Sequence, residues 1–213
     1  MKQRNVAILI FNDVEVLDFC GPFEVFSVTG KRDGLTPFNV YTVAEHPLIS
    51  ARNSLSVNPS YSFQTCPQPD ILVIPGGGGR RVDGTPFGTR KEMDNKRLLA
   101  WINQRYPSTE HILSVCTGAL ILAKAGLVTN RVATTHHLAL DELRQIAPTA
   151  EVRADERVVD SGKLVFSGGI SAGIDASFYL VAKLLGKAVA LETATYMEYN
   201  WPGESHGAIA TDN

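Results

Sequence analysis

The sequence predicts an α/β fold, a three-layer α/β/α sandwich in which helices cover both faces of a mostly parallel sheet. Segments with strand character alternate with helical segments through the first half of the chain, which is the order typical of parallel sheets. The apolar runs at 6–11 and 71–74 are continuous rather than alternating, as in strands buried on both faces. A chain of 213 residues, 44% of them hydrophobic, can form a sizeable core without disulfides.

The first half of the chain contains the most regular pattern. Segments with the apolar spacing of a helix alternate with strand-like apolar runs, and Gly126 ends the last helix of this half. A polar stretch at 46–66 with short β patches indicates a small hairpin. We expect strands at 6–11, 38–43, 70–75 and 111–115, and helices at 16–27, 95–104 and 119–124.

The second half is less regular but ends in strongly apolar helices. The turn at 160–163, Asp-Ser-Gly-Lys, predicts a hairpin between two short strands. We expect one domain over residues 1–200 and a loosely ordered tail over 201–213, because the tail contains Pro202, Gly203 and Gly207. The expected elements are strands at 132–135, 157–159 and 164–166, a weak β patch at 151–153, and helices at 138–146, 174–185 and 189–199.

The composition excludes several classes of partner. The net charge of −2 gives no long-range attraction for nucleic acid or an anionic membrane. The first strand starts within a few residues of Met1, and its apolar run is too short for a signal peptide or a membrane span. Three cysteines without zinc spacing indicate free thiols in a reducing cytoplasm and no metal site.

Cys116 is the first candidate for chemistry. An apolar strand at 111–115 runs directly into a helix at 119–124, and this is the arrangement of a nucleophile elbow with sulfur in place of oxygen. The N–H groups and partial positive charge at the start of the helix favour a thiolate, so we expect a lowered Cys116 pKa. The alternative is a small, buried apolar residue at the end of a strand.

Two carboxylates after the first strand are candidate partners of Cys116. Asp18 lies among apolar residues, and a buried carboxylate beside a cysteine can accept or return a proton or hold an attacking water. Capping the helix is the alternative role, and from the residue type alone the favoured one. Glu24 lies further into the same helix and is the second choice.

Glycine-rich turns are candidates to contact a substrate bound at Cys116. The run from Gly76 to Gly79, which includes Gly77, lacks the spacing of a P-loop or a dinucleotide fingerprint. It is either a plain turn or, as we favour, an oxyanion hole with the Thr117 N–H opposite, because this strand is expected beside the cysteine strand. The turn with Gly168, Gly169 and Ile170 is either a wall of the pocket or a site of close packing.

Other polar side chains have less certain roles. The Thr117 hydroxyl either binds a substrate atom or caps its own helix. His136 and His137 follow two threonines, and a catalytic pair requires one imidazole within reach of Cys116. Cys20, in mid-helix, is expected to be buried, and Cys66 lies in a loop without an evident role.

These motifs resemble the ThiJ/PfpI superfamily, which is related to the class I glutamine amidotransferases, over roughly residues 5–185. Within the superfamily the Cys-Thr-Gly elbow resembles the branch that contains isonitrile hydratases and the amidotransferase-like domains of AraC-type regulators. The motifs that carry the resemblance are Leu-Asp-Phe-Cys-Gly-Pro at 17–22, Ile-Pro-Gly-Gly at 74–77, Ser-Val-Cys-Thr-Gly at 114–118, Ala-Thr-Thr-His at 133–136 and Gly-Gly-Ile-Ser-Ala-Gly-Ile-Asp at 168–175.

The resemblance implies a flavodoxin-like sandwich and a homodimer, with Cys116 as nucleophile, Asp18 beside it and Thr117 completing the polar site. It implies a small-molecule substrate and no cofactor. Three departures matter. Thr117 stands where the peptidase-like branch has histidine, which disfavours a Cys–His peptidase. His137 stands where the hydratases usually have tryptophan, which changes the expected lining of the pocket. No helix-turn-helix pair follows Leu185, so we expect a stand-alone copy of the sensing domain rather than a full AraC-type regulator if the regulator branch applies.

Three functions are therefore compared. The first is hydration or hydrolysis of a small electrophile, with an isonitrile converted to an N-substituted formamide through a Cys116 thioimidate. The second is a non-catalytic small-molecule or redox sensor with an oxidisable Cys116. A deglycase or glyoxalase comes third, because that chemistry usually has a glutamate and a histidine near the cysteine.

Overall fold

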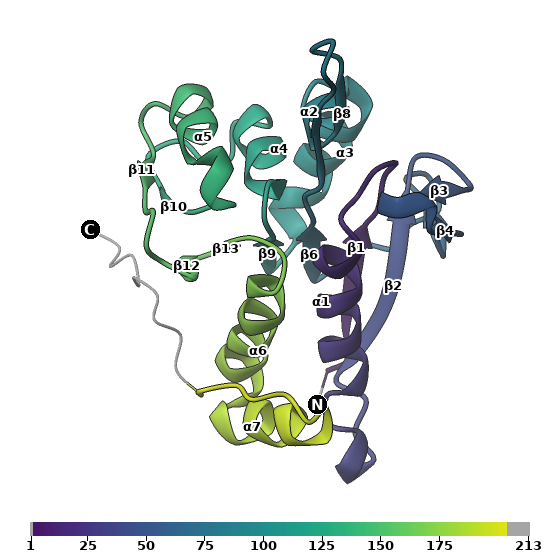
Figure 1. Ribbon diagram of the computed structural model, residues 1–213. Coiled ribbons are helices and arrows are strands. Elements are labelled where there is room, and N and C mark those ends of the chain that lie inside the picture. The colour runs from purple at the N-terminus through teal and green to yellow at the C-terminus, as the bar shows by residue number, and fades with distance from the viewer. Residues whose placement is uncertain (1, 204–213) are drawn as a thin grey trace.

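A seven-stranded sheet forms the centre of the computed structural model, which describes residues 2–203 (Figure 1). The strand order is β12-β13-β9-β6-β1-β2-β5, and only β12 runs antiparallel to its neighbour. The predicted mostly parallel sheet is confirmed. The strands are β1 (Arg4–Leu9), β2 (Phe38–Ala44), β5 (Tyr61–Ser62), β6 (Ile71–Ile74), β9 (His111–Ser114), β12 (Val158–Ser161) and β13 (Leu164–Ser167).

Helices cover both faces of this sheet, as predicted. In Figure 1, α1 and α6 lie side by side on one face with α7 packed across their ends, while α3 and α4 lie on the other face. α5 packs against α4. The helices are α1 (Val16–Val28), α2 (Thr89–Glu92), α3 (Lys96–Arg105), α4 (Gly118–Lys124), α5 (Leu140–Ile146), α6 (Ala172–Leu185) and α7 (Lys187–Tyr196), with 3₁₀ turns at Lys31–Asp33, Arg52–Ser54, Tyr106–Ser108 and His137–Ala139.

Apolar side chains explain why the inner strands lie where they do. Ile8 of β1 pairs in register with Val73 of β6, and both side chains are fully buried. Because helices cover both faces of the sheet, side chains on both sides of these strands are removed from water, and a continuous apolar run stabilises this position. At α3 the Asn95 side chain accepts the N–H groups of Arg97 and Leu98, so the helix predicted from residue 95 begins one residue later, after its cap.

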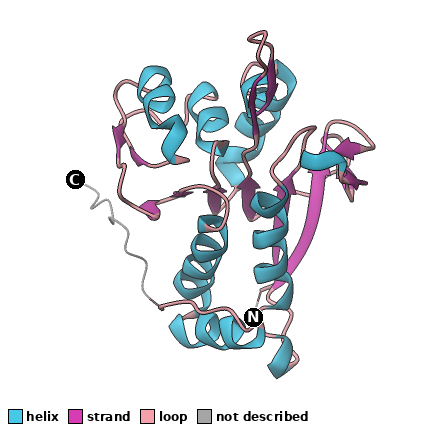
Figure 2. Cartoon of the chain, viewed as in Figure 1, coloured by secondary structure: helices cyan, strands magenta, loops and turns pink. Residues whose placement is uncertain are grey.

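Three two-stranded pieces lie outside the main sheet (Figure 2). The hairpin expected within 46–66 is β3 (Ile49–Ser50) with β4 (Ser56–Val57), and the weak patch at 151–153 pairs as β11 (Glu151–Val152) with β10 (Val132–Ala133). The third, β7 (Gly78–Arg80) with β8 (Pro86–Gly88), was not expected. Of the glycines after Pro75, expected to form an oxyanion hole or a plain turn, Gly78 and Gly79 belong to the first arm of this hairpin.

The C-terminal segment differs from the expectation in its first residues. Trp201 is buried and its ring stacks on Phe178 of α6, with 5.5 Å between ring centroids. The predicted loosely ordered tail therefore does not begin at residue 201, because a large aromatic surface is removed from water there. The remainder of that predicted tail, residues 204–213, lies outside the described residues. Over residues 2–203, no helix combines the length and the apolar character needed to cross a membrane.

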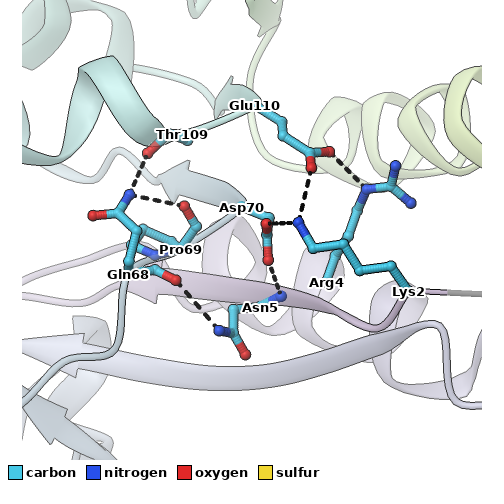
Figure 3. Close-up of polar contacts among 8 residues, drawn as sticks. All are labelled: Lys2, Arg4, Asn5, Gln68, Pro69, Asp70, Thr109 and Glu110. Atoms are coloured by element: carbon cyan, nitrogen blue, oxygen red, sulfur yellow. Dashed lines mark hydrogen bonds and ion pairs between the residues drawn. The ribbon is translucent and has the colours of Figure 1, made fainter.

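Ion pairs close the end of the sheet where the inner strands begin (Figure 3). Asp70 precedes β6, and its carboxylate accepts from the Asn5 N–H and from the Lys2 ammonium. Glu110 precedes β9 and pairs with Arg4 at 2.7 Å and with Lys2 at 3.3 Å. Two carboxylates at this edge are thus matched by two cations.

Candidate active site

Cys116 lies on the turn that joins β9 to α4. Its φ angle is +55°, a left-handed conformation that residues other than glycine rarely adopt and that a nucleophile elbow requires. Cys116 is only 5% exposed, yet it lines a cavity that opens above the elbow. The predicted elbow is present, and the alternative of a thiol enclosed only by apolar packing does not apply.

Hydrogen bonds from two other segments hold this strained turn. The Cys116 N–H donates to the carbonyl of Gly168 at 3.0 Å. The Thr135 hydroxyl donates to the carbonyl of Cys116 at 2.8 Å. Gly168 follows β13 of the main sheet and Thr135 follows β10 of a separate two-stranded piece, so two different segments fix the backbone of the elbow. Thr135 was quoted only as part of a motif in the sequence, and its contact with the elbow was not predicted.

Asp18 is completely buried next to the Cys116 thiol. Its Oδ2 accepts the N–H of Gly76 at 2.9 Å, whereas its Oδ1 accepts no hydrogen bond among the described residues. The helix cap lies at Glu15 rather than at Asp18, so capping does not explain the carboxylate. One carboxylate oxygen is therefore anchored, and the other is available beside the sulfur.

Burial dominates the ionisation of this pair. It raises the pKa of Asp18 to about 7 against the opposing effect of the Gly76 N–H, and the nearby charge of Glu15 adds to the rise. Burial, followed by the negative charge of Asp18, raises the pKa of the Cys116 thiol to about 12. The expected lowering of the Cys116 pKa is wrong, because loss of water outweighs the backbone N–H groups of Ile170 and Thr117 that face the sulfur.

The glycines after β6 have a different task from the predicted one. The Gly76 N–H is taken by Asp18, and the Gly77 N–H donates to the Thr117 hydroxyl at 3.0 Å. A Cβ on Gly76 would lie 2.4 Å from the Thr117 nitrogen, so only glycine permits this approach. These two N–H groups cannot also form an oxyanion hole. They hold the two polar side chains of the site in place.

The Thr117 hydroxyl belongs to a buried polar chain. It accepts from Gly77 and lies 3.0 Å from the Thr89 hydroxyl, and it makes no capping bond to its own helix. The proposed self-capping therefore does not occur. Thr89, at the start of α2, was missed in the sequence, because nothing local distinguishes it from a surface threonine. Its burial results from the β7–β8 hairpin that precedes it.

The turn before α6 forms the opposite wall of the site. Ile170 has φ +50°, an unusual conformation for a β-branched residue, and this turn directs its N–H toward the Cys116 sulfur. The N–H groups positioned to stabilise charge at the sulfur are thus those of Ile170 and Thr117. Gly169 leaves room for the His136 ring, since a Cβ there would lie 2.2 Å from the His136 Cδ2.

His136 reaches the cavity, and His137 does not line it. The two rings stack with centroids 4.3 Å apart, and His136 lines the cavity while His137 is exposed. Burial lowers the pKa of His136, and the neighbouring His137 and Arg90 lower it further. His136 is therefore neutral at pH 7. Its Nδ1 accepts the Leu138 N–H at 3.2 Å, so Nε2 carries the proton and can donate a hydrogen bond.

Three other candidates lie away from the cavity. Glu24 is exposed on α1 and does not line it. Cys20 is exposed, contrary to the expected burial, because α1 turns this position toward water. Cys66 is buried, with its thiol 3.2 Å from the Pro67 carbonyl. Cys116 is thus the cysteine that combines a partner carboxylate with access to a cavity.

The cavity above Cys116 has a volume of about 660 Å³ and a lining in which polar and apolar surface are mixed. The predicted residues Gly77, Thr117, His136 and Ile170 contribute to it. The charged lining was missed in the sequence, because it is assembled from distant segments. It consists of Glu15, Arg52, Arg80, Arg90 and Glu142.

A family comparison agrees with this geometry. The model of the DJ-1/PfpI family matches residues 4–183, a span that contains the sheet, the elbow, Asp18 and the turn at Ile170. The chain belongs to the DJ-1/PfpI family.

Relatives within and around the DJ-1/PfpI family differ in function. The chain is 30% identical to isonitrile hydratase of Pseudomonas putida over 91% of its own length and 78% of the enzyme. It is 24% identical to the HTH-type transcriptional regulator CdhR of Pseudomonas aeruginosa, over 87% of this chain but only 52% of the regulator. Because the chain is similar to both an enzyme and a regulator, the choice between these functions depends on the geometry of the site.

Solved structures support the same fold. A ThiJ/PfpI family protein from Pseudomonas syringae superposes with a TM-score of 0.80 at 28% identity, covering 94% of this chain and 76% of that one. DJ-1beta of Drosophila melanogaster superposes with a TM-score of 0.78 at 16% identity, covering 94% of this chain and all of that one. The flavodoxin-like sandwich implied by the motifs is thus confirmed.

The site of this DJ-1/PfpI protein does not have the side chains of a metal centre. Over residues 2–203, no three His, Cys, Asp or Glu side chains come close enough together to coordinate one ion. The chemistry that the arrangement supports is carried by its own groups. These are a thiol, an adjacent carboxylate with a pKa near neutrality, and two N–H groups directed at the sulfur.

Proposed function

We propose that this protein hydrates a small isonitrile to an N-substituted formamide through a thioimidate on Cys116. The observation that carries the proposal is the buried Asp18–Cys116 pair. Asp18 has one oxygen without a partner beside the thiol and a pKa near 7, which suits a group that must both take up and release a proton at neutral pH. The 30% identity to isonitrile hydratase supports the same reaction.

In the first step a thiol adds across the terminal carbon of the isonitrile. The Cys116 sulfur forms the new bond to that carbon, and Asp18 takes the thiol proton and delivers it to the same carbon. The product is a thioimidate, with the carbon bonded to sulfur, hydrogen and nitrogen. The raised pKa of Cys116 is compatible with this step, because the proton held by the thiol is consumed in the addition.

In the second step water releases the product. The Asp18 carboxylate takes a proton from water, which attacks the thioimidate carbon, and the nitrogen becomes protonated. Collapse of the tetrahedral intermediate breaks the carbon–sulfur bond and returns a proton to the thiol, which leaves the formamide. The N–H groups of Thr117 and Ile170, which face the sulfur, are placed to stabilise charge that develops around the reacting carbon.

The alternatives receive less support from the geometry. A redox sensor requires an exposed thiol with a lowered pKa, whereas Cys116 is 5% exposed and its pKa is raised by burial. A deglycase of the expected type needs a glutamate beside the cysteine, but the carboxylate beside Cys116 is Asp18. The hydratase proposal requires a protonated thiol beside a carboxylate, which is the arrangement of Cys116 and Asp18.

Formamide production from butyl isonitrile tests the proposal. We expect the wild-type protein to form N-butylformamide and the Cys116→Ala variant to form none. The exposed Cys20 supplies a matched control, because Cys20→Ala removes a thiol of the same chain away from the cavity. Equal turnover by the wild-type and Cys116→Ala proteins would contradict a covalent role for Cys116. Loss of turnover in Cys20→Ala would indicate that Cys20, and not Cys116, is the nucleophile.

A further inference from the structure

The charges around the cavity indicate what kind of substrate fits it. Three arginines and two glutamates line it, so with neutral His136 the lining carries a formal charge of about +1 at pH 7. Apolar side chains contribute little beyond Leu138, Ala139 and Ile170. An apolar substrate would remove water from these charged groups without replacing its hydrogen bonds. The cavity therefore suits a substrate that has a polar or charged group besides its apolar part.

Two of the three arginines are already paired. Arg90 donates twice to the Glu142 carboxylate, from Nε at 3.0 Å and from Nη2 at 2.7 Å. Arg52 lies 3.5 Å from the carboxylate of Glu15. These pairs join different segments across the cavity walls, and each leaves no net charge.

Arg80 is the remaining cation. Its guanidinium donates only to the carbonyl of Gly84 in its own hairpin, at 3.3 Å, and no carboxylate of residues 2–203 pairs with it. The planar fork of arginine matches a carboxylate, with two parallel hydrogen bonds.

The position of Arg80 relative to the thiol is fixed through the backbone. Gly77 is hydrogen-bonded to Thr117, the residue next to Cys116. Arg80 follows Gly77 by three residues, a segment that reaches at most about 10 Å, and both Arg80 and Cys116 line the same cavity. A short, flexible substrate can thus place its reactive carbon at Cys116 and an anionic end at Arg80.

We propose that the substrate carries an anionic group, a carboxylate in the simplest case, which Arg80 binds while Cys116 attacks the other end. This inference rests on the proposed function for the nature of the reactive end, an isonitrile carbon. The binding of the anion depends only on the cavity and its unpaired guanidinium. The substrate class is then an ω-isocyano carboxylate rather than a hydrocarbon isonitrile.

A matched pair of substrates and a matched pair of variants test this. The substrates are 4-isocyanobutanoate and its methyl ester, which differ in charge at the end remote from the reacting carbon. Arg80→Gln removes the proposed contact. Arg81→Gln is the control, because Arg81 lies in the same strand region but places its guanidinium over the Phe87 ring, 5.1 Å from its centroid, and does not line the cavity.

We expect the wild-type protein to favour the carboxylate over the ester at least about tenfold in kcat/KM, since hydrogen bonds to charged groups contribute that much or more. Arg80→Gln should abolish the preference by raising KM for the carboxylate, with little change for the ester, and Arg81→Gln should retain it. Equal kcat/KM for the two substrates, or a preference that survives in Arg80→Gln, would overturn the inference.

Calorimetric binding to the Cys116→Ala variant separates this inference from the proposed reaction. If neither isonitrile is turned over by the wild-type protein, the hydratase proposal fails on its own. Tighter binding of 4-isocyanobutanoate than of its ester, lost when Arg80→Gln is added to the Cys116→Ala variant, would still support the anion site. Equal binding of the acid and the ester would refute the anion site, whatever the turnover.

Discussion

The two ends of the central sheet give an aspartate carboxylate opposite surroundings. Where the inner strands begin, Lys2 and the Asn5 N–H hold Asp70 (Figure 3). Burial there raises the pKa of Asp70, but these partners outweigh it and the pKa is lowered overall. Where the strands end, Asp18 has one backbone N–H, the nearby carboxylate Glu15 and a thiol, and burial raises its pKa to about 7.

The difference lies in the partners rather than in the side chain. Both residues are aspartates that accept a backbone N–H; Asp70 directly precedes β6, and Asp18 lies in the first turn of α1. The Lys2 ammonium favours the ionised form of the Asp70 carboxylate, and this ion pair stabilises the fold. The absence of a cation beside Asp18 among the described residues allows it to change protonation state near pH 7, which serves chemistry. The comparison predicts that Asp→Asn changes at the two ends have separable effects.

The largest expected effect is the loss of activity in Asp18→Asn. The amide oxygen can still accept from Gly76, but the side chain can no longer take the thiol proton, so we expect kcat for formamide production to fall by about 10²–10⁴-fold. Glu24→Gln, on the exposed face of the same helix, should keep its activity. Full activity of Asp18→Asn would show that Asp18 is not the catalytic base. Loss of activity in Glu24→Gln would instead assign that role to Glu24.

The second effect is on stability, and its sign follows from the raised pKa of Asp18. The unfolded chain releases this proton near its ordinary pKa of 3.8, whereas the folded protein holds it until about 7. Ionisation therefore opposes folding increasingly from about pH 4 to pH 7, by at most about 4 kcal/mol. Asp18→Asn escapes this cost, and urea denaturation should show it more stable than wild type at pH 8.

The pH dependence supplies the internal control for that measurement. At pH 4 the wild-type carboxyl is protonated in the folded protein and only about half protonated in the unfolded chain, whose pKa is near 3.8, so most of the advantage of Asp18→Asn at pH 8 should be lost there. An advantage of equal size at both values would indicate a packing effect of the amide instead. The kcat of the wild-type protein should rise over the same interval, through an apparent pKa near 7, because the proposed base is the ionised Asp18.

Much of this arrangement could be predicted from the sequence where the determinants are local. Continuous apolar runs predicted the inner strands, and a strand that meets a helix at a cysteine predicted the elbow. Asp18 was singled out as a carboxylate among apolar residues. Each of these features depends on neighbours within a few positions, so the pattern of residue types is sufficient.

The rest depended on contacts between distant segments. The direction of the Cys116 pKa shift was predicted wrongly, because the degree of burial is set by elements that pack over the elbow. The oxyanion role of Gly76 and Gly77 failed for the same reason, since Asp18 and Thr117 come from other segments to occupy their N–H groups. The ion pair of Arg90 with Glu142 joins residues 52 positions apart, so no local sequence pattern predicts it.

A smaller effect tests whether the elbow must be held rigidly. Thr135→Val removes the hydroxyl that donates to the Cys116 carbonyl and keeps the shape of the side chain. We expect kcat to fall about tenfold, since a misplaced thiol reacts more slowly, and stability to fall by about 1 kcal/mol. Thr134→Val is the control, because the hydroxyl of Thr134 donates to the Arg153 carbonyl instead. It should cost similar stability without a change in kcat, and equal kcat losses in both variants would refute a specific role for Thr135.

The smallest effect is expected at the opposite end of the sheet, in Asp70→Asn. The amide still accepts from the Asn5 N–H but loses its charge toward Lys2, so we expect a loss of roughly 0.5–1 kcal/mol at pH 7 and no change in kcat. Because the folded-state pKa of Asp70 is lowered, its contribution is complete above its ordinary pKa of 3.8 and is lost as the pH falls through the folded-state value. The difference between wild type and Asp70→Asn should therefore disappear in acid, and 1 M salt should reduce it at pH 7. Asp18→Asn stabilises in the neutral range and Asp70→Asn destabilises there. If urea denaturation instead gave both variants the same sign at pH 8, the partners of the two carboxylates would not explain their different roles.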